Sequence, residues 1–309
     1  MKKLPINMKL PEGFLKEEVR CGYIVTEKMK AVWAVELDLY KELKRVCEKH
    51  DLSIYADGGT VIGAARHQGF IPWDDDMDFC LSRIDYEKLC RIAKDEFTYP
   101  YFWQTETTDP GTARGHGQLR NMATTAISDY SKHFGKVHGI FIDIFPYDNV
   151  PEDDKERHDY LRSIEHLAMK RSKYRELQYG INNSKGLKKF MKQLGILYVK
   201  TFYSHGDNPY YRELEHLKLK YRDINTLLWS NLYAVYLNNL DRCVLKKEYH
   251  RQTIDMPFEM ITVQVPALYN EYLTHVYGNW REFVIGLNVH GETTFDPYTP
   301  YEQYLEVNK

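Results

Sequence analysis

The acidic run at residues 74–78, Asp-Asp-Asp-Met-Asp, has the residue types and spacing best suited to chemistry. Asp76 and Asp78 are separated by Met77 and precede the apolar run 79–81. Residues two apart on a strand project from the same face, so we expect these carboxylates to lie side by side. Adjacent carboxylates repel each other unless a cation lies between them, and hard oxygen ligands suit Mg²⁺ or Mn²⁺. The run therefore predicts a divalent metal site.

Two other interpretations of the acidic run need to be weighed. An EF-hand Ca²⁺ loop that starts at Asp74 requires Gly at its sixth position and Glu at its twelfth. The chain has Phe79 and Asp85 at those positions, which argues against such a loop. A solvated acidic turn explains Asp74 and Asp75, but not two aspartates that enter an apolar strand. Asp74 could support the metal site or bind a second ion.

A glycine turn, Gly58-Gly59-Thr60, lies between the strand-like run 53–56 and the helical run 60–67. Glycine lets a backbone approach a ligand closely, and a helix N-terminus attracts phosphate. We therefore expect Gly58, Gly59 and Thr60 to bind the phosphates of a substrate.

A third carboxylate stands in a separate apolar run. Asp143 lies within Phe-Ile-Asp-Ile-Phe, residues 141–145, and a buried aspartate needs a partner or a metal. A Gly-Gly turn followed by an Asp-x-Asp strand resembles the layout of the nucleotidyltransferase fold, in which a neighbouring strand supplies a third carboxylate. This resemblance makes Asp143 the candidate that completes the site with Asp76 and Asp78.

A longer stretch carries a closer resemblance. The run GGTVIGAARHQGFIPWDDDMDF at 58–79, with RIDYEKL just after it, resembles the LicD family of phosphocholine transferases. This family belongs to the nucleotidyltransferase superfamily, as do the fukutin-type ribitol-phosphate transferases. LRNMATTAI at 119–127, IDIFPYD at 142–148 and YLTHVYGNW at 272–280 also fit. The resemblance covers residues 30–150 well and the C-terminal third only lightly.

The resemblance implies an enzyme that transfers phosphocholine from CDP-choline to a hydroxyl of a cell-surface glycan, such as lipopolysaccharide, or of a teichoic-acid precursor, with release of CMP. Mg²⁺ or Mn²⁺ held by Asp76, Asp78 and Asp143 would neutralise charge on the transferring phosphoryl group. One alternative is a nucleotidyltransferase, or a phosphotransferase for another CDP-alditol such as CDP-ribitol or CDP-glycerol. The other is a catalytically silent binding protein of the same fold, against which the intact set of acids argues.

Three more residues are candidates for substrate binding. Arg120, a cation in a mostly neutral run, could clamp the donor phosphates, because Arg can bond two oxygens at once. The alternative is that Arg120 pairs with an acidic surface residue. Arg66 ends the helical run after the glycine turn and could contact the diphosphate or the acceptor. Trp73 lies beside the acidic run and is a candidate wall of an aromatic cage for the choline ammonium group.

Several elements must position these residues. Apolar residues recur at helical spacing from Thr26, a predicted N-cap, to about His50, and predict a helix packed on a sheet. We expect the α+β class, with a nucleotidyltransferase-fold mixed sheet flanked by helices and a largely helical C-terminal part. The expected divisions are an irregular lead-in at 1–25, a catalytic core at 26–150 and a mainly helical acceptor-side region at 151–309.

Composition narrows the function classes. A net charge of −2 over 309 residues argues against a general nucleic-acid binder. Five cysteines without a CxxC pair indicate free thiols in a reducing compartment. The N-terminus lacks the apolar stretch of a signal peptide, and no run has the length and composition of a membrane span. We therefore expect a cytoplasmic protein.

A basic segment at residues 185–200 raises the question of membrane contact. Apolar residues at helical spacing are accompanied there by Lys185, Lys188, Lys189, Lys192 and Lys200. Such a helix can lie on an anionic membrane surface, here the inner face of the membrane. The alternative is a surface helix of a bundle that covers the catalytic domain.

Overall fold

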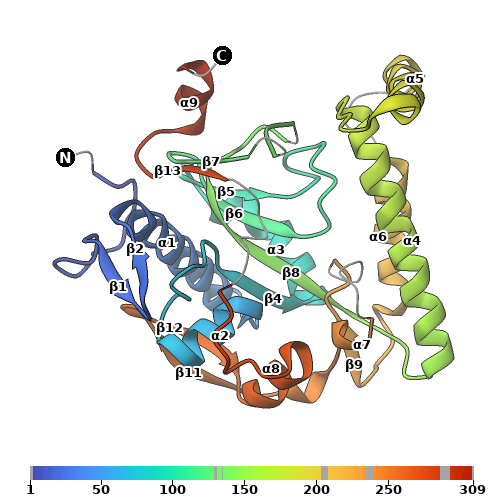
Figure 1. The fold of residues 1–309 in the computed structure, drawn as a ribbon. Helices are drawn as coiled ribbons and strands as arrows, with labels where there is room; N and C mark the ends of the chain where they lie inside the picture. The colour runs from blue at the N-terminus through green and yellow to red at the C-terminus, as the bar shows by residue number, and fades with distance from the viewer. Residues whose placement is uncertain are drawn as a thin grey trace.

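A mixed β-sheet lies at the centre of the protein (Figure 1). The structure is a computed structural model, and it describes residues 3–128, 131–133, 135–202, 208–233, 240–285 and 293–307. The described sheet has the order β10-β9-β8-β4-β3, with β6 paired to β8 and β5 paired to β6. Its strands are β3 (Tyr55–Ala56), β4 (Asp78–Ser82), β5 (Tyr101–Gln104), β6 (Gly117–Asn121), β8 (Ile140–Asn149), β9 (Leu228–Ser230) and β10 (Val244–Lys246).

Strand β8, with ten residues, joins the parts of this sheet. Its residues 143–147 run parallel to β4 on one side, and its residues 140–144 run antiparallel to β6 on the other. Its last two residues pair with β9. Met77 and Phe79 are fully buried in the core, whereas Asp76 and Asp78 are only partly buried. The alternation expected for the acidic run is therefore present.

Three helices from the N-terminal half pack around the sheet: α1 (Glu27–Lys49), α2 (Gly58–His67) and α3 (Arg83–Glu96). Thr26 caps α1, as predicted, by accepting a hydrogen bond from the backbone N–H three residues on. Trp33 of α1 stacks on Phe70 and Tyr40 stacks on Phe79, with ring centroids 4.5 Å apart in both pairs. Large stacked aromatic pairs contribute more than their buried area alone, so they fix α1 beside the acidic run.

The C-terminal part of the chain packs back onto the same core. Phe258, Val263, Tyr272 and Phe295 belong to the hydrophobic cluster that contains α1 and β4. The hairpin of β11 and β12 packs against α2 and β3, and β13 pairs with β7. The elements are β7 (Thr125–Ile127), β11 (Thr253–Phe258), β12 (Ile261–Pro266), α8 (Tyr269–Tyr277), β13 (Thr294–Asp296) and α9 (Tyr301–Val307).

A second, smaller cluster is built by helices beside the C-terminal end of β8. Val150, Tyr160, Ile164 and Leu214 are buried there. Helix α4 packs against both α5 and α6, and Figure 1 shows α5 at the far end of α4 from the central sheet. The elements are α4 (Asp154–Gln178), α5 (Gly186–Phe202), α6 (Pro209–Lys218) and α7 (Leu240–Cys243), with short 3-10 helices at Ser131–His133, Leu219–Tyr221 and Lys247–His250.

The N-terminal lead-in, expected to be irregular, contains a hairpin of β1 (Glu18–Arg20) and β2 (Tyr23–Val25). Three-residue strands are too short to leave an alternating pattern in the sequence, which explains the error. Arg20 bonds Glu259 at 2.8 Å and so ties the hairpin to the turn between β11 and β12.

The predicted α+β class is confirmed: helices and mixed sheets share the described chain. The division at residues 26–150 and 151–309 stays a prediction, since the C-terminal part supplies strands and core residues to the first division as well as helices. Among the described residues, no helix combines the length and the hydropathy needed to cross a membrane.

Candidate active site

The parallel pairing of β4 and β8 brings the predicted carboxylates together. Asp78 begins β4 and stands opposite Asp143 of β8 in the register. Asp143 N–H donates to the carbonyl of Met77 at 3.0 Å, which fixes the two strands at this level. Asp76, Asp78 and Asp143 each offer a carboxylate oxygen, and these oxygens lie within 4.8 Å of one another. The geometry fits a metal ion, and metal binding itself stays a prediction.

The two facing carboxyls have different electrostatic surroundings. Burial raises the pKa of Asp78 well above its usual value, and the nearby charges of Asp76 and Asp143 add to this effect. Burial also opposes ionisation of Asp143, but His116 and Arg114 outweigh it and lower its pKa to about 2. Asp78 needs a positive charge of its own before it ionises as readily as Asp143 does. A divalent cation would supply that charge.

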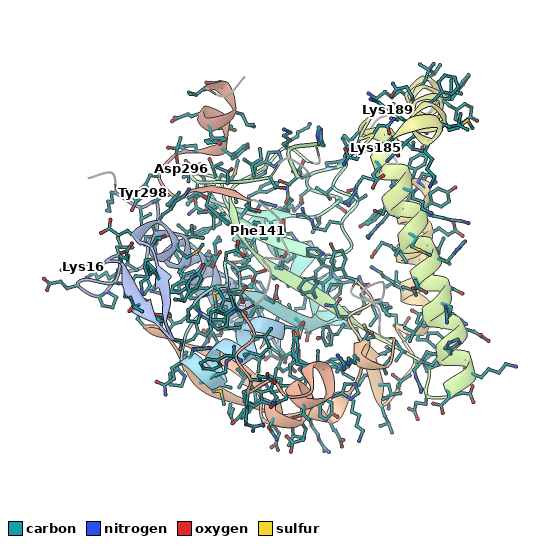
Figure 2. All side chains as sticks on the ribbon, viewed as in Figure 1. Lys16, Phe141, Lys185, Lys189, Asp296 and Tyr298 are labelled. Carbon is teal, nitrogen blue, oxygen red and sulfur yellow. The ribbon has the colours of Figure 1, made fainter. Side chains whose placement is uncertain are left out.

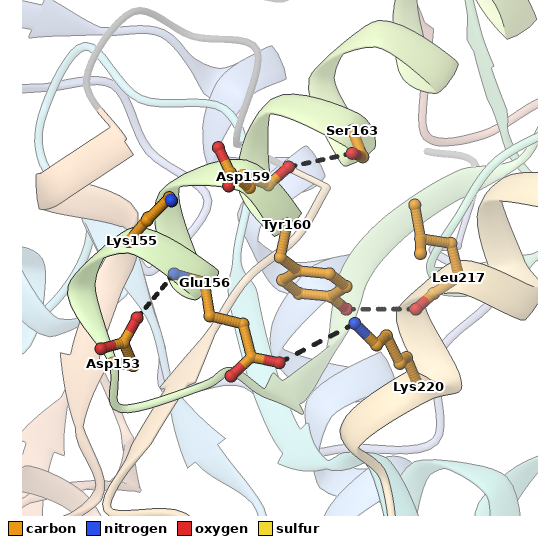
Figure 3. A pocket seen from close by; sticks show the side chains of 8 residues that line it. All are labelled: Asp153, Lys155, Glu156, Asp159, Tyr160, Ser163, Leu217 and Lys220. Carbon is orange, nitrogen blue, oxygen red and sulfur yellow. Dashed lines mark hydrogen bonds and ion pairs between the residues drawn. The ribbon is translucent and has the colours of Figure 1, made fainter.

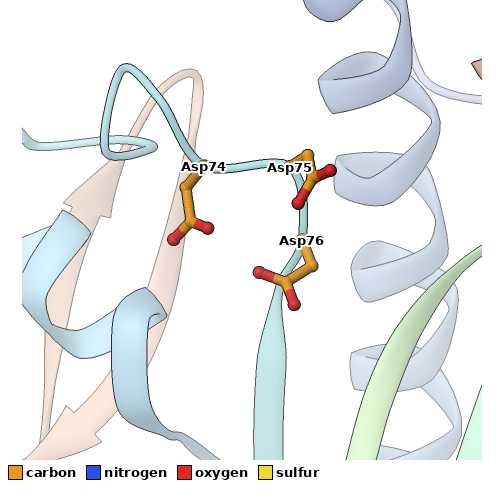
Figure 4. A group of neighbouring side chains, drawn as sticks. All are labelled: Asp74, Asp75 and Asp76. Atoms are coloured by element: carbon orange, nitrogen blue, oxygen red, sulfur yellow. The ribbon is translucent and has the colours of Figure 1, made fainter. Parts of the chain in front are cut away.

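Asp74, Asp75 and Asp76 form a second acidic group just before β4 (Figure 4). One carboxylate oxygen from each also lies within 4.8 Å of the others. Among the described residues, Oε2 of the buried Glu36 carboxyl on α1 has no hydrogen-bond partner. Burial raises the pKa of Glu36, and Asp76 and Asp75 raise it further. Glu36 was not predicted, because one of several acids in a long helix gives no separate sequence signal.

Two side chains hold Asp143 in place. His116 Nε2 lies 2.8 Å from Asp143 Oδ1, and Gln118 Nε2 donates to the same oxygen at 2.7 Å. Gln118 stands opposite Asp143 in the pairing of β6 with β8. Burial lowers the pKa of His116 to about 4, so the imidazole is neutral at pH 7. Neither residue was predicted, because cross-strand register cannot be read from one sequence.

Arg120 occupies a different place from the one expected of a phosphate clamp. Its side chain is buried, donates to Gln118 Oε1 and Gln104 Oε1, and donates to the carbonyl of Gly139 at 2.6 Å. Its guanidinium also lies 4.5 Å from the ring centroid of Phe141. Contact with a donor would require Arg120 to give up these bonds. The arrangement favours a role in orienting Gln118, the partner of Asp143, and the expected contact of Arg120 with donor phosphates stays a prediction.

The predicted glycine turn lies directly against two of the acidic residues, Asp74 and Asp78. A Cβ atom added to Gly58 would lie 3.4 Å from Asp78 Oδ2, and one added to Gly59 would lie 2.9 Å from Asp74 Oδ2. Thr60 Oγ1 accepts a hydrogen bond from Asp78 N–H at 2.8 Å. The first turn of α2 and the start of β4 are therefore linked, and only glycine leaves room for a ligand between them.

A buried carboxylate anchors this turn. Asp57, the N-cap of α2, accepts a hydrogen bond from Gly58 N–H at 2.9 Å. The hydroxyl of Tyr147 donates to Asp57 at 2.9 Å. The hydroxyl of Tyr272 from α8 also donates to Asp57. An aspartate at a helix N-terminus is favoured by the helix dipole. Helix α8 thus helps to set the position of α2.

Tyr277, at the end of α8, faces the acidic group. Its hydroxyl oxygen would lie 3.2 Å from a Cβ atom at Gly58, on the side of Asp78. Burial raises its pKa, and the charges of Asp57 and Asp78 raise it further. A ligand bound at the start of α2 would therefore meet this hydroxyl as a hydrogen-bond donor. The Tyr-Gly pair was noted in the sequence, but its position at the site was not predicted.

Trp73 directly precedes the acidic residues 74–76, and Arg66 lies in the last turn of α2. The Trp73 ring is 6.2 Å from the ring of Tyr23 and 6.3 Å from those of His67 and Phe283. Arg66 Nη1 donates to the carbonyl of Trp280 at 2.9 Å and its guanidinium lies 4.7 Å from the Phe283 ring. Arg66 therefore ties the segment after α8 to α2, and its expected contact with substrate stays a prediction.

A separate surface pocket lies between the start of α4 and the 3-10 helix after α6 (Figure 3). Two pairs of its polar groups contact each other: Asp153 accepts from Glu156 N–H at 2.8 Å, and Lys220 lies 3.9 Å from Glu156. None of the predicted site residues lines it. The pocket is therefore not a candidate for the chemistry of the acidic group.

An Asp-x-Asp strand beside a third carboxylate strand, with a glycine turn at the start of a helix, defines an enzyme of the nucleotidyltransferase class. Comparison with known proteins agrees: residues 51–179 match the family model described as LicD/FKTN/FKRP, nucleotidyltransferase domain. The chain is 27% identical over 249 residues to the lipopolysaccharide cholinephosphotransferase LicD of Haemophilus influenzae, covering 80% of this chain and 88% of that protein. The family model and this relative together support a LicD-like transferase, to which the chain is similar over these residues.

Two shorter matches concern uncharacterised proteins. RP689 of Rickettsia prowazekii is 38% identical over 54 residues, which is 18% of this chain and 20% of that protein. RT0683 of Rickettsia typhi is 36% identical over 63 residues, which is 20% of this chain and 19% of that protein. These matches add no information on the reaction.

Proposed function

We propose that this protein transfers phosphocholine from CDP-choline to a hydroxyl of a cell-surface glycan, with lipopolysaccharide or a teichoic-acid precursor as the acceptor class. The observation that carries the proposal is the group of Asp76, Asp78 and Asp143, with carboxylate oxygens within 4.8 Å, against the first turn of α2. The relative from Haemophilus influenzae, named for cholinephosphate transfer to lipopolysaccharide, supports this choice of donor group.

The reaction is a displacement at phosphorus. The acceptor oxygen forms a bond to the choline-side phosphorus, the bond from that phosphorus to the bridging oxygen breaks, and CMP leaves. The hydroxyl proton passes to a carboxylate of the site or to water. The acidic residues Asp76, Asp78 and Asp143 would hold Mg²⁺ or Mn²⁺, which neutralises charge on the transferring phosphoryl group. Gly59 lets the diphosphate approach the start of α2, whereas the Gly58 N–H already donates to Asp57.

An aromatic cluster next to the acidic residues supports choline as part of the transferred group. Trp73 and Tyr23 meet edge to face, and His67 lies beside them. Burial and the charge of Arg66 lower the pKa of His67 to about 4, so this ring adds no positive charge at pH 7. Quaternary ammonium groups bind aromatic faces, and Trp is the strongest. Arg66 already covers Phe283, which leaves Trp73 and Tyr23 as the proposed walls.

A thermal-shift titration tests the donor. The protein is heated in Mg²⁺ with CDP-choline, CDP-ribitol, CDP-glycerol or CTP, because a ligand that binds the native state raises the melting temperature with its concentration. We expect the largest shift with CDP-choline, and its loss in Asp78→Asn. A larger shift with another CDP-alditol would replace choline in the proposal. A response to CTP alone would indicate nucleotidyl transfer, and no response to any nucleotide would contradict the proposal.

Residence in the cytoplasm, with the acceptor presented at the inner face of the membrane, is part of this proposal. It follows from a nucleotide-linked donor, which is a cytoplasmic metabolite class.

A further inference from the structure

Helix α5 exposes an apolar face. Leu187 is 78% exposed, Leu197 63% and Phe202 71%, although residues of these types are usually buried. The exposed large apolar side chains of the helix are Leu187, Phe190, Met191, Leu194, Leu197, Tyr198 and Phe202. They recur three, four and seven residues apart, so they share one side of the helix.

The opposite side of α5 is the one that packs on the protein. Ile196 and Val199 are buried, and Gly195 lies close to Leu177 of α4. Lys192 bonds Glu176 of α4 at 2.6 Å. The exposed face is therefore not the face with which α5 folds onto α4. The alternative raised from the sequence, a surface helix of a bundle that covers the catalytic domain, does not by itself explain the exposed apolar face.

The charge of the segment is of one sign. Between residues 177 and 206 the sequence has five lysines and no aspartate or glutamate. Lys185 and Lys189 lie at the end of α4 with α5, away from the central sheet (Figure 2). The long aliphatic stems of lysine can lie along an apolar surface while the ammonium groups reach anionic groups at its edge.

We propose that α5 is a docking surface for an anionic lipid bilayer. Its exposed apolar side chains would enter the boundary between headgroups and acyl chains, and its lysines would contact anionic headgroups. The segment carries five lysines and no acidic residue, so its charge favours an anionic occupant over a second copy of the same helix. The helix has 17 residues and lies in the interface rather than across it.

A chain of contacts connects α5 to the acidic group. At the end of α4, the Tyr179 hydroxyl donates to the carbonyl of Gly111 at 2.9 Å, and Arg175 donates to that of Thr112 at 2.9 Å. The same loop carries His116, which bonds Asp143. Docking of α5 would thus hold the site at the bilayer surface, where a lipid-linked acceptor is presented. Only this last step rests on the proposed function.

Vesicle co-sedimentation of the full chain tests the docking surface. The probes are vesicles of phosphatidylcholine alone and vesicles with added phosphatidylglycerol. We expect at least tenfold tighter binding to the anionic vesicles, and weaker binding when salt rises from about 0.1 M to about 1 M, because the Debye length falls from about 10 Å to about 3 Å. Equal binding to neutral vesicles, or no binding to either, would overturn the proposal.

A matched pair of variants assigns the effect to α5. The test variant is Leu187→Ser/Phe190→Ser/Leu194→Ser, and the control is Ile84→Ser/Leu227→Ser, which removes exposed apolar side chains elsewhere. We expect the test variant to lose at least nine-tenths of vesicle binding, with unchanged circular dichroism, and the control to bind as wild type. Equal binding by both variants would contradict the assignment, and a dimer in solution that the test variant abolishes would assign the face to a second copy.

Failure of this proposal can be told apart from failure of the proposed reaction. Asp78→Asn should bind anionic vesicles as wild type does, since it lies outside the docking surface. The α5 variant should still show the thermal shift with CDP-choline. Loss of both responses in either variant would indicate misfolding, which the circular dichroism spectrum and melting temperature would reveal.

Discussion

Asp78 and Asp143 face each other across two parallel strands but differ in ease of ionisation. His116 and Gln118 bond Asp143, whereas the partly buried Asp78 has Asp76 and other acids as charged neighbours. A carboxyl whose pKa is raised by folding stabilises the native state fully only below its unfolded pKa, and that stabilisation is lost as pH rises through the folded value. Without a cation, Asp78 therefore weakens the fold at neutral pH.

The first prediction follows from this imbalance. In EDTA at pH 7.5, the melting temperature of Asp78→Asn should be about 2 °C or more above that of wild type, because the variant removes one repelling charge. Adding Mg²⁺ should stabilise wild type and leave the variant unchanged. Differential scanning calorimetry measures both. If Mg²⁺ stabilises the two proteins equally, the ion binds elsewhere.

Two tyrosines of α8 give a matched test of site and scaffold. Tyr272→Phe removes a donor from buried Asp57 and should lower the free energy of unfolding by about 1–3 kcal/mol. Tyr277→Phe should leave stability nearly unchanged and reduce turnover about tenfold to a hundredfold, because a donor to the developing phosphoryl charge is lost. Denaturant unfolding and kcat distinguish them. Normal turnover in Tyr277→Phe would remove this residue from the site.

The three carboxylates of the site could be predicted from the sequence, but the residues that hold them in place could not. The i, i+2 spacing of Asp76 and Asp78 and the isolation of Asp143 in an apolar run are properties of the sequence itself. His116, Gln118 and Tyr277 reach the site through strand register and through the return of the C-terminal part, which one sequence does not encode visibly. Arg120 was recognised as unusual, but its neighbours were unknown.

Helix α2 is positioned by a close approach to the chain around it. A Cβ atom on Gly63 would lie 2.5 Å from the backbone oxygen of Gly69 and 3.2 Å from Phe258 of β11. Helix α2 begins at the glycine turn, so its position against β11 also sets the turn against the acidic group. Among the elements, α1 and its cap were predictable from apolar spacing, whereas this glycine contact was not.

A glycine in helix α5 provides a control for Gly63 of α2. Gly63→Ala should reduce the free energy of unfolding by about 1–3 kcal/mol, because backbone rather than a flexible side chain blocks the added methyl group. Gly195→Ala in α5 meets only the Leu177 side chain, at 3.3 Å, and should be neutral or stabilising by about 0.5–1 kcal/mol. Urea unfolding measures both. Equal destabilisation by the two variants would refute the proposed contact at Gly63.

The whole molecule keeps several histidines buried and neutral. Burial lowers the pKa of His250 to about 3 and that of His138 to about 4. In the unfolded chain these groups titrate near 6.5, so between about 4 and 6.5 the unfolded state binds more protons. Stability should therefore be retained above pH 6.5 and should fall as pH falls below it.

His250→Phe tests this acid sensitivity. The ring packs edge-on against Tyr55, Trp229 and Tyr272, and both its nitrogens lack partners among the described residues. A phenyl ring should therefore fit, and the loss of stability below pH 6.5 should become shallower by up to about 1.4 kcal/mol per pH unit. Exposed His158→Phe serves as the control. Parallel pH profiles for wild type and His250→Phe would contradict this account.

The central claim is metal-dependent phosphocholine transfer at Asp76, Asp78 and Asp143. The most direct measurement follows CMP release from CDP-choline, with lipopolysaccharide stripped of phosphocholine as the acceptor, for wild type and Asp143→Asn. We predict CMP and glycan-bound phosphocholine in equal amounts for wild type in Mg²⁺, and a loss of at least about a hundredfold in EDTA or in the variant. Wild-type rates in EDTA or in Asp143→Asn would contradict the account.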